Sequence, residues 1–386
     1  MSDFSDFYNS TGIAGLDWRA GIMLLLGLGF IFVAVVKGRE PYVLLPIGLG
    51  VIIANLPDTH MTSFVAVGAE NQQSGIFGIV LYYGLTFWDI LPPIIFLGLG
   101  AMTDFSPVIA NPKTLLLGAA AQIGIFVAFW GALLVGSFLD IEFTIHEAAV
   151  IGIIGGADGP TTIFLSGVLA PQLLGVTAVV AYTYMASVVF IQPPLMKMLT
   201  TKSEREIIMS APRDVSRTEK LIFPAIAMIT IILVVPGSAP LVSMFMMGNI
   251  FRESGVVPRL ADTASNELLN ITTIFLMVTV GTQLSADTMF KVDTLVILAL
   301  GLVAFACGTM GGLLFAKLMN LVLKEKINPL IGSAGVSAVP MAARISHQVG
   351  QEGNPRVFLL AHAMGPNVAG VIGSAVVAGV FISLLQ

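Results

Sequence analysis

Long apolar runs alternate with short polar segments along almost the whole chain. Within the runs, apolar and polar positions do not alternate, and most runs approach the roughly 20 residues that a helix needs to cross a membrane. The pattern predicts an all-α polytopic membrane protein, with apolar runs at about residues 20–36, 42–56, 77–101, 114–138, 171–192, 220–236, 267–284, 293–318 and 356–385. The shorter runs predict tilted, broken or re-entrant helices.

Two further apolar stretches, 146–169 and 328–346, are interrupted by Gly, Ser and Pro. The first contains IIGGADGPTTIF, in which Asp158 stands between Gly156 and Gly159. Gly tolerates almost any backbone angle and Pro lacks an N–H donor, so a regular helix is not expected to pass through this sequence. We predict that each stretch forms a broken hairpin that dips into the protein interior.

The composition agrees with a membrane protein. Of the 386 residues, 56% are hydrophobic and only 11% are charged, whereas a typical soluble domain has about 25% charged residues. The net charge of −5 gives no reason to expect a nucleic-acid partner. A single cysteine, Cys307, excludes an internal disulfide and a Cys-rich metal site.

Lys and Arg concentrate in two places. Lys37 and Arg39 follow the first run, and the hydrophilic segment 196–221 carries six cations. The positive-inside rule places both clusters in the cytoplasm and the N-terminus outside. The predicted organisation is N-terminal membrane helices (1–76), a first repeat with a broken hairpin (77–195), a cytoplasmic linker (196–221), a connecting membrane segment (222–266) and a second repeat with a broken hairpin (267–386).

The two halves resemble each other at a constant offset of 179 residues. IFLGLGAMTDFS at 95–106 matches IFLMVTVGTQLS at 274–285, and the same offset places Asp158 over Ser337. Paired segments interrupted by Gly or Pro, in corresponding positions of two halves, mark the binding sites of transporters near the membrane midplane. We therefore expect the two breaks to face each other across a shared cavity.

Residues in and near the breaks offer oxygen ligands. The side chains that supply them are Asp158, Ser337, Asn328 and Asn367. Backbone carbonyls are expected to be released at Gly155, Gly156 and Gly159. Oxygen ligands of this kind favour Na⁺ or H⁺ over a transition metal. A carboxylate at mid-membrane costs about 2.5–3.5 kcal/mol, so such residues usually serve a function. The alternative is that Asp158 only caps a helix or pairs with Arg344.

Other polar residues within apolar runs leave their roles open. The planar guanidinium of Arg344 suits a carboxylate, either of a ligand or of Asp158. Tyr184 is either a hydrogen-bonded core residue or a proton donor. Asp89 and Asp104 stand near expected helix ends beside Pro or turn residues, and capping accounts for both.

Four long motifs carry a resemblance to one family. They are GAMTDFSPVIANPKTLLLGAAAQIGIF, IGIIGGADGPTTIFLSGVLAPQLLG, AYTYMASVVFIQPP and LLAHAMGPNVAGVIGSAVVAGV. Together they are similar to the β subunit of the sodium-pumping, biotin-dependent decarboxylases that act on oxaloacetate, methylmalonyl-CoA, glutaconyl-CoA or malonate. The resemblance covers nearly the whole chain.

The resemblance implies a function and partners. In this family the β subunit receives carboxybiotin from separate carboxyltransferase and biotin-carrier subunits, releases CO₂, and moves Na⁺ outward while consuming an external proton. The implied partners also include a small single-span subunit of γ or δ type, a homotrimer of this chain and the lipid of a bacterial inner membrane. Biotin attachment to this chain is not expected, because Lys197 in LMKML lacks the surrounding β pattern of a biotinylated lysine.

The resemblance also implies site residues and a fold. Asp158 matches an aspartate regarded as central to Na⁺ binding and coupling, and Tyr184 matches a functional tyrosine. We expect Asp158, Asn367 and backbone carbonyls of the first break to form one Na⁺ site, with Tyr184 and Ser337 near a second. Polar positions of the second broken segment and the C-terminal helix match Asn328, Gly332, Ser337, Arg344 and Asn367. The implied fold has two inverted repeats with broken re-entrant hairpins, which form a mobile, elevator-like core against a scaffold.

Two alternatives stay open at this point. A secondary Na⁺/carboxylate symporter of the same two-repeat architecture would need the same cation site but no decarboxylation. The primary substrate is also open, although the segment 57–76 is shorter than in the oxaloacetate members of the family. This length favours an acyl-CoA substrate.

Overall fold

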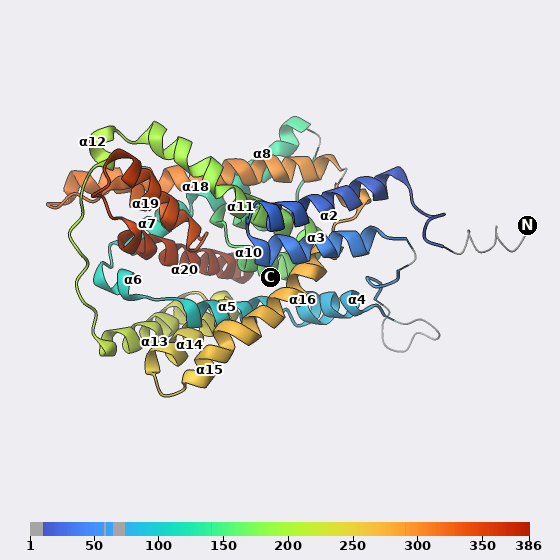
Figure 1. Cartoon of the computed structure of the whole chain (residues 1–386), viewed down its shortest axis with the longest axis horizontal. Helices are drawn as coiled ribbons and strands as arrows, with labels where there is room; N and C mark the ends of the chain where they lie inside the picture. Colours follow the sequence, from blue (N-terminus) through green and yellow to red (C-terminus); the bar gives the residue numbers. More distant parts are fainter. Residues whose placement is uncertain (1–10, 58, 65–73, 140, 290) are drawn as a thin grey trace, which may run out of the picture.

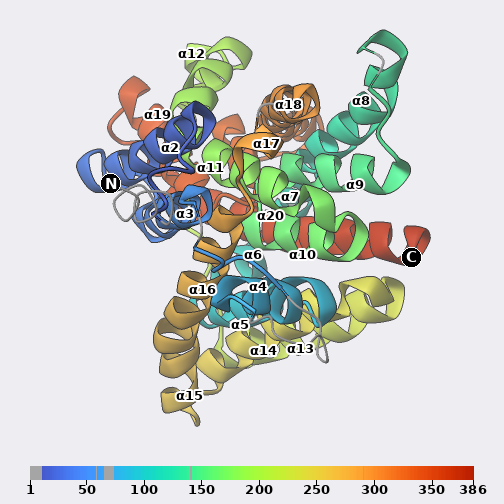
Figure 2. The ribbon, with the colours of Figure 1, turned by 90° about the vertical axis from the view of Figure 1, so that its right-hand side faces the viewer.

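The computed structural model describes residues 11–57, 59–64, 74–139, 141–289 and 291–386. The described part consists of α-helices joined by short 3₁₀ and π-helical segments, and it contains no strand. The longest helix, α18 (Val292–Val322), runs along the long axis of the molecule in Figure 1 and is seen nearly end-on in Figure 2. The predicted all-α class is confirmed. The expected position of the N-terminus and part of the short segment 57–76 lie outside the described residues.

Within the described residues, four helices are long and apolar enough to cross a membrane: Trp18–Val36, Thr114–Val135, Val292–Val322 and Leu360–Leu385. Two bent pairs raise the number to six if each is one span. One pair joins Ile76–Phe87 to Leu91–Met102 at 77°, and the other joins Pro171–Met185 to Ser187–Leu199 at 57°. Several of the predicted runs therefore form helices too short to cross alone.

The helices form two layers, which Figure 2 separates into an upper and a lower group. The lower group contains α4 (Ile76–Leu81), α5 (Leu91–Met102), α13 (Arg217–Val234), α14 (Ala239–Ser254), α15 (Pro258–Thr263) and α16 (Leu269–Thr282). Its central pair packs at glycines: a Cβ on Gly100 of α5 would lie 1.9 Å from the Phe245 carbonyl oxygen of α14. Small residues of this kind let apolar helices approach closely in a membrane.

The upper group surrounds both interrupted stretches (Figure 2). It contains α2 (Trp18–Val36), α3 (Pro41–Asn55), α7 (Thr114–Ala121), α8 (Ile123–Leu139), α9 (Ile145–Ile153), α10 (Gly159–Leu169), α11 (Leu174–Leu199), α18, α19 (Met341–Gly353) and α20 (Leu360–Leu385). The first stretch folds as α9, the 3₁₀ segment η2 (Ile154–Gly156) and α10. The second folds as the 3₁₀ segment η6 (Pro329–Gly335) and α19. Each is a broken hairpin.

The two hairpins open toward opposite ends of α20. His146, at the start of the first hairpin, lies with Nε2 3.0 Å from the carbonyl oxygen of Leu385. The other end of α20 lies beside the linker, where His362 and Ser210 line one cavity. The second hairpin opens on this linker side, because its Glu352 pairs with Lys197 at 2.6 Å. A helix of 26 residues spans about 39 Å, so the openings lie far apart.

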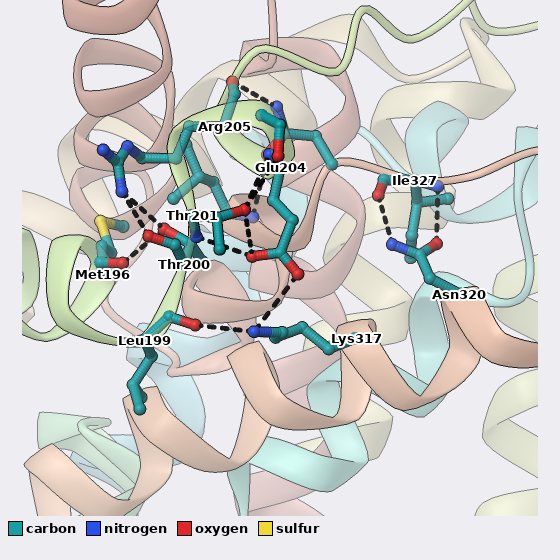
Figure 3. A network of polar contacts seen from close by, with 12 residues as sticks. Met196, Leu199, Thr200, Thr201, Glu204, Arg205, Lys317, Asn320 and Ile327 are labelled. Carbon is teal, nitrogen blue, oxygen red and sulfur yellow. Dashed lines mark hydrogen bonds and ion pairs between the residues drawn. The ribbon is translucent and has the colours of Figure 1, made fainter.

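The linker is anchored to the end of α18 (Figure 3). Glu204 of the short helix α12 (Lys202–Arg205) accepts a hydrogen bond of 2.7 Å from the Thr201 amide. Lys317 of α18 lies 3.2 Å from Glu204 and donates to the Leu199 carbonyl oxygen at 3.1 Å. Burial raises the pKa of Glu204, but hydrogen bonds from Thr201 and Lys317 and the Lys317 charge outweigh it and hold that pKa below its usual range.

Lys317→Met is expected to loosen this anchor. The substitution keeps a long, unbranched side chain but removes the ion pair and the hydrogen bond to Leu199, which for a partly exposed pair contribute about 0.5–1 kcal/mol. Amide hydrogen exchange over residues 199–206 should accelerate several-fold. Lys324→Met is the matched control, because Lys324 is exposed and has no ion pair with any described residue. Equal exchange in both variants would contradict the anchor.

Candidate functional site

The first break is produced by its own sequence. Ala157 adopts a left-handed backbone with φ 54°, and Asp158 is extended with φ −123°. Asp158 then caps α10, since its Oδ1 accepts a hydrogen bond of 3.3 Å from the Thr161 amide. Gly159 follows because a Cβ there would lie 2.2 Å from the ring of Tyr182. The capping role considered for Asp158 is therefore present, and it leaves Oδ2 for other partners.

The second break crosses the first. The Ser337 amide donates a hydrogen bond of 3.0 Å to the carbonyl oxygen of Gly156. Gly332 lets the second break approach α18, because a Cβ there would lie 2.1 Å from the Gly312 carbonyl oxygen. The two segments that the sequence offset paired thus touch through their backbones.

Asp158 is buried, with 4% of its surface exposed, and its partners are hydroxyl and amide groups. Oδ2 accepts a hydrogen bond of 2.7 Å from Ser374 of α20, whose Oγ lies 3.4 Å from Ser337 Oγ. No Lys, Arg or His among the described residues forms an ion pair with this carboxyl group. The alternative pairing of Asp158 with Arg344 is absent from the structure. A buried carboxylate without a cation is costly, and either a bound proton or a bound cation would remove that cost.

Buried oxygens beside the breaks also lack donors. Asn367 donates through Nδ2 to the carbonyl oxygens of Ala334 (2.9 Å) and Val336 (2.8 Å), which leaves its Oδ1 without a hydrogen-bond partner. Gln122, the residue between α7 and α8, lies beside Gly156, and its Oε1 also has no hydrogen-bond partner. Buried acceptors are normally satisfied. Together with the carboxylate, these oxygens form the kind of ligand set that a hard cation prefers.

A cavity of about 450 Å³ reaches the crossing point from the other layer. Asp158, Gly159 and Ser337 line one wall. Asn270 and Thr273 of α16 line the wall opposite, together with other residues of α5 and the π-helical segment before α16. Asp158 and Ser337 therefore share one cavity, as the sequence offset predicts, and this cavity lies between the two layers of helices.

The two tyrosines of YTYM point in different directions. Tyr182 lines the cavity and packs against Gly159, next to Asp158. Tyr184 instead donates a hydrogen bond to the Leu298 carbonyl oxygen of α18 and does not line the cavity. Residues two apart on a helix lie about 200° apart around its axis, so only one can face the site. In this conformation that residue is Tyr182.

Asn328 and Arg344 also lie away from the cavity. Asn328 donates through Nδ2 to the carbonyl oxygens of Arg205 (2.8 Å) and Ile207 (3.0 Å), while its Oδ1 accepts from the Leu330 amide. Its side chain thus fastens the linker to the second break. Arg344 is exposed on α19, the helix whose far end pairs with the linker, and its guanidinium has no partner among the described residues.

Sequence reasoning missed three residues of the site: Gln122, Tyr182 and Ser374. Each is a polar residue in an apolar run, which was the available signal. The sequence contains many such residues, and only the packing of α10, α11 and α20 shows which of them face Asp158.

Comparison with known proteins decides the family. The profile of the Na⁺-transporting oxaloacetate decarboxylase beta subunit matches residues 19–385. The chain belongs to this family. It is 56% identical to the methylmalonyl-CoA decarboxylase subunit beta of Propionigenium modestum, with 98% of each chain covered. It is 51% identical to the glutaconyl-CoA decarboxylase subunit beta of Acidaminococcus fermentans (97% of this chain, 96% of that protein) and 48% identical to the oxaloacetate decarboxylase beta chain of Klebsiella pneumoniae (99% of each).

As a member of the Na⁺-transporting decarboxylase β family, the chain is the membrane subunit of a biotin-dependent decarboxylase pump. The predicted resemblance is confirmed over the full length of the chain. Of the two functions that the sequence left open, family membership supports the decarboxylase and not the symporter. A β subunit is one part of a multi-subunit complex, so this chain acts together with partners.

Proposed function

We propose that Na⁺ binds where the two breaks cross, with Asp158, Asn367 and Ser337 as ligands. The observation that carries the proposal is a buried carboxylate without a cation partner in the described part of the chain, beside an Asn367 oxygen without a donor. A bound Na⁺ would satisfy both groups. Gln122 is a further candidate ligand, because its free Oε1 faces Gly156.

Tyr184 and Asn328 are not among the proposed Na⁺ ligands in this conformation. Both were expected to contribute to Na⁺ binding, but their polar atoms are engaged with the backbone of α18 and of the linker. A role for either in the cation site requires another conformation of the protein. Tyr182 supplies the phenol that faces the cavity in this one.

The proposed reaction is the decarboxylation of carboxybiotin, which a separate biotin-carrier subunit presents after loading by a carboxyltransferase. The N–CO₂⁻ bond breaks, CO₂ leaves, and the ring nitrogen takes up one proton. Arg344 would hold the carboxylate with its planar fork. Its exposure on α19, whose far end pairs with linker residue Lys197, supports access from the linker side. Loss of CO₂ removes the negative charge that Arg344 had bound, which couples the chemistry to a change of conformation.

Transport is proposed to follow an elevator-like movement of one layer against the other. Two inverted repeats would form the moving core, and the opposite openings of the two hairpins support this arrangement. The position of the cavity between the layers supports it too, because a sliding layer would carry the cation past the fixed one. Moving one Na⁺ against 100 mV costs about 2.3 kcal/mol, which decarboxylation must supply.

The remaining partners and the substrate follow from the relatives. We propose a complex with a carboxyltransferase, a biotin carrier and a small single-span subunit, a homotrimer of this chain, and the bacterial inner membrane as its location. An acyl-CoA is the proposed primary substrate. Alignments to oxaloacetate chains extend over 427 positions, against 392 for the methylmalonyl-CoA subunit of Propionigenium modestum. The 386-residue chain thus lacks the insertions of the oxaloacetate members.

Arg344→Lys tests the carboxybiotin role. A lysine keeps the charge but loses the bidentate pairing, so turnover in the assembled complex should fall at least tenfold. Protection of the protein by Na⁺ against heat should remain, because Arg344 does not touch the cation site. Arg356→Lys is the control, since Arg356 is also exposed beyond the end of α19. Retained turnover with a changed Na⁺ affinity would remove Arg344 from the carboxybiotin site.

A further inference from the structure

A second buried carboxyl group lies far from the proposed Na⁺ site. Asp89 stands in the bend between the π-helical segment η1 (Tyr82–Phe87) and α5, with a left-handed backbone of φ 48°. It is 9% exposed, and neither carboxyl oxygen has a hydrogen-bond partner. The expectation that Asp89 caps α5 is therefore wrong. The physical reason is that Pro92 and Pro93 remove N–H donors from the first turn of the helix.

Asp104 provides the contrast. Its Oδ1 accepts a hydrogen bond of 2.9 Å from the Ser106 amide and lies 3.8 Å from Lys220. Asp104 thus holds the Ser106 amide at the start of the short helix α6 (Ser106–Ala110), one residue before the cap position at Phe105, which has no side-chain cap of its own. The two aspartates were equivalent by sequence, and the structure separates a satisfied carboxylate from one that is buried without a partner.

No Lys, Arg or His in the part of the chain that the structure describes forms an ion pair with Asp89. Its carboxyl group faces the backbone of α10, where a Cβ on Gly167 would lie 3.3 Å from Oδ1 and 2.3 Å from the Leu85 carbonyl oxygen. The helices α4, α5 and α10 carry no titratable side chain, and η1 contributes only the phenols of Tyr82 and Tyr83. A charged carboxylate in such a place costs several kcal/mol, whereas a neutral carboxyl group avoids most of that penalty. These surroundings therefore favour the neutral, protonated form of Asp89.

Asp89 lies on the side of Asp158 that faces away from the linker. The helix α10 begins at the Asp158 cap, and Gly167 lies nine residues further, about 14 Å along the axis. That direction leads to the opening of the first hairpin, away from the linker, and Figure 1 shows α4 at the opposite end of the molecule from α12. Two buried hydroxyl groups of α10 stand between Asp158 and Gly167 in the sequence: Thr162 Oγ1 donates to the Asp158 carbonyl oxygen at 2.8 Å, and Ser166 Oγ lies 2.8 Å from Thr177 Oγ1.

We infer that Asp89 takes up the proton that decarboxylation consumes, from the side of the membrane opposite the linker. The inference rests on the proposed function. The neutral carboxyl group of Asp89 gives its proton inward, the ring nitrogen of carboxybiotin gains one proton as the N–CO₂⁻ bond breaks, and CO₂ leaves. The Asp89 carboxylate is then reprotonated from the outer solution when its contact with α10 opens. One proton enters for each CO₂ released.

Proteoliposomes that carry the whole complex with the linker side outward test this step. In these vesicles the lumen corresponds to the side of the membrane opposite the linker. A pH-sensitive dye in the lumen therefore reports protons taken up from that side, and K⁺ with valinomycin holds the membrane potential constant. Wild-type complex should make the lumen alkaline by one proton for each CO₂. Asp89→Asn, which keeps the shape but carries no exchangeable acid, should lower luminal proton uptake per CO₂ at least tenfold. Asp104→Asn is the matched control and should behave as wild type.

The outcomes separate the two levels of the proposal. Luminal proton uptake by Asp89→Asn equal to that of wild type would overturn the role of Asp89 alone. Wild-type vesicles that release CO₂ without Na⁺ dependence or luminal alkalinisation would overturn the proposed function together with it. Na⁺ protection against heat checks that the variant is folded. If Asp89→Asn fails to fold, Asp89→Glu decides: an unshifted dependence of turnover on luminal pH would contradict the inference.

Discussion

Asp158→Asn is expected to abolish Na⁺-stimulated decarboxylation. The amide keeps the size of the side chain and an oxygen for Ser374, but it removes the one acidic group that lines the cavity in the described part of the chain. Loss of one partner of a buried charge pair costs about 3–5 kcal/mol, which corresponds to at least 100-fold in affinity. CO₂ release by the purified complex, with and without Na⁺, measures the effect.

Asp104→Asn is the control for this experiment, because Asp104 contacts Ser106 and Lys220 and does not itself line the cavity. It should keep its turnover and its response to Na⁺. Near-normal activity with normal Na⁺ dependence in Asp158→Asn would mean that the carboxylate only caps α10.

Gly159→Ala should also impair the site strongly, although it adds a single methyl group. Its Cβ would lie 2.2 Å from the Tyr182 ring, which is itself buried, so either α10 or the tyrosine must move. Overpacking of this kind costs about 1–3 kcal/mol and displaces the Asp158 cap. Turnover should fall at least tenfold, and Na⁺ should protect the variant less well against heat.

Gly29→Ala is the matched control, because no atom lies within 4 Å of a Cβ built on Gly29. That substitution in α2 should leave turnover unchanged, since alanine is also the better helix former. Equal activity of the two alanine variants would show that the space between Gly159 and Tyr182 is not needed.

The fold class could be predicted because apolar runs and Gly or Pro breaks are local signals. The pairing of Asp158 with Ser337 could also be predicted, because the offset between the halves brought the breaks into correspondence before any contact was known. The bond from the Ser337 amide to Gly156 shows that this inference reached the correct neighbours. The number of complete spans was less predictable, because sharp bends divide two of the apolar runs, and only the bend before Pro92 has a proline beside it.

The direction of individual side chains could not be predicted. In α11 nearly every residue is apolar, so no amphipathic pattern distinguishes Tyr182 from Tyr184. Because Arg344 follows an apolar break, the sequence indicates a buried residue. In the structure, however, α19 has one polar face, and Arg344 is exposed on it. Gln122 and Ser374 reach the site from helices distant in sequence. Such contacts depend on tertiary packing, which local hydropathy does not encode.

Calorimetric titration of the purified complex with NaCl, at constant ionic strength and with K⁺ as the replaced cation, tests most directly whether Na⁺ binds at Asp158. Wild-type complex should bind Na⁺ saturably and show no binding of K⁺. Asp158→Asn, folded to the same extent by its melting temperature without Na⁺, should show no saturable Na⁺ binding over the same range. Na⁺ binding by this variant with wild-type affinity would contradict a cation site at the crossing of the two breaks.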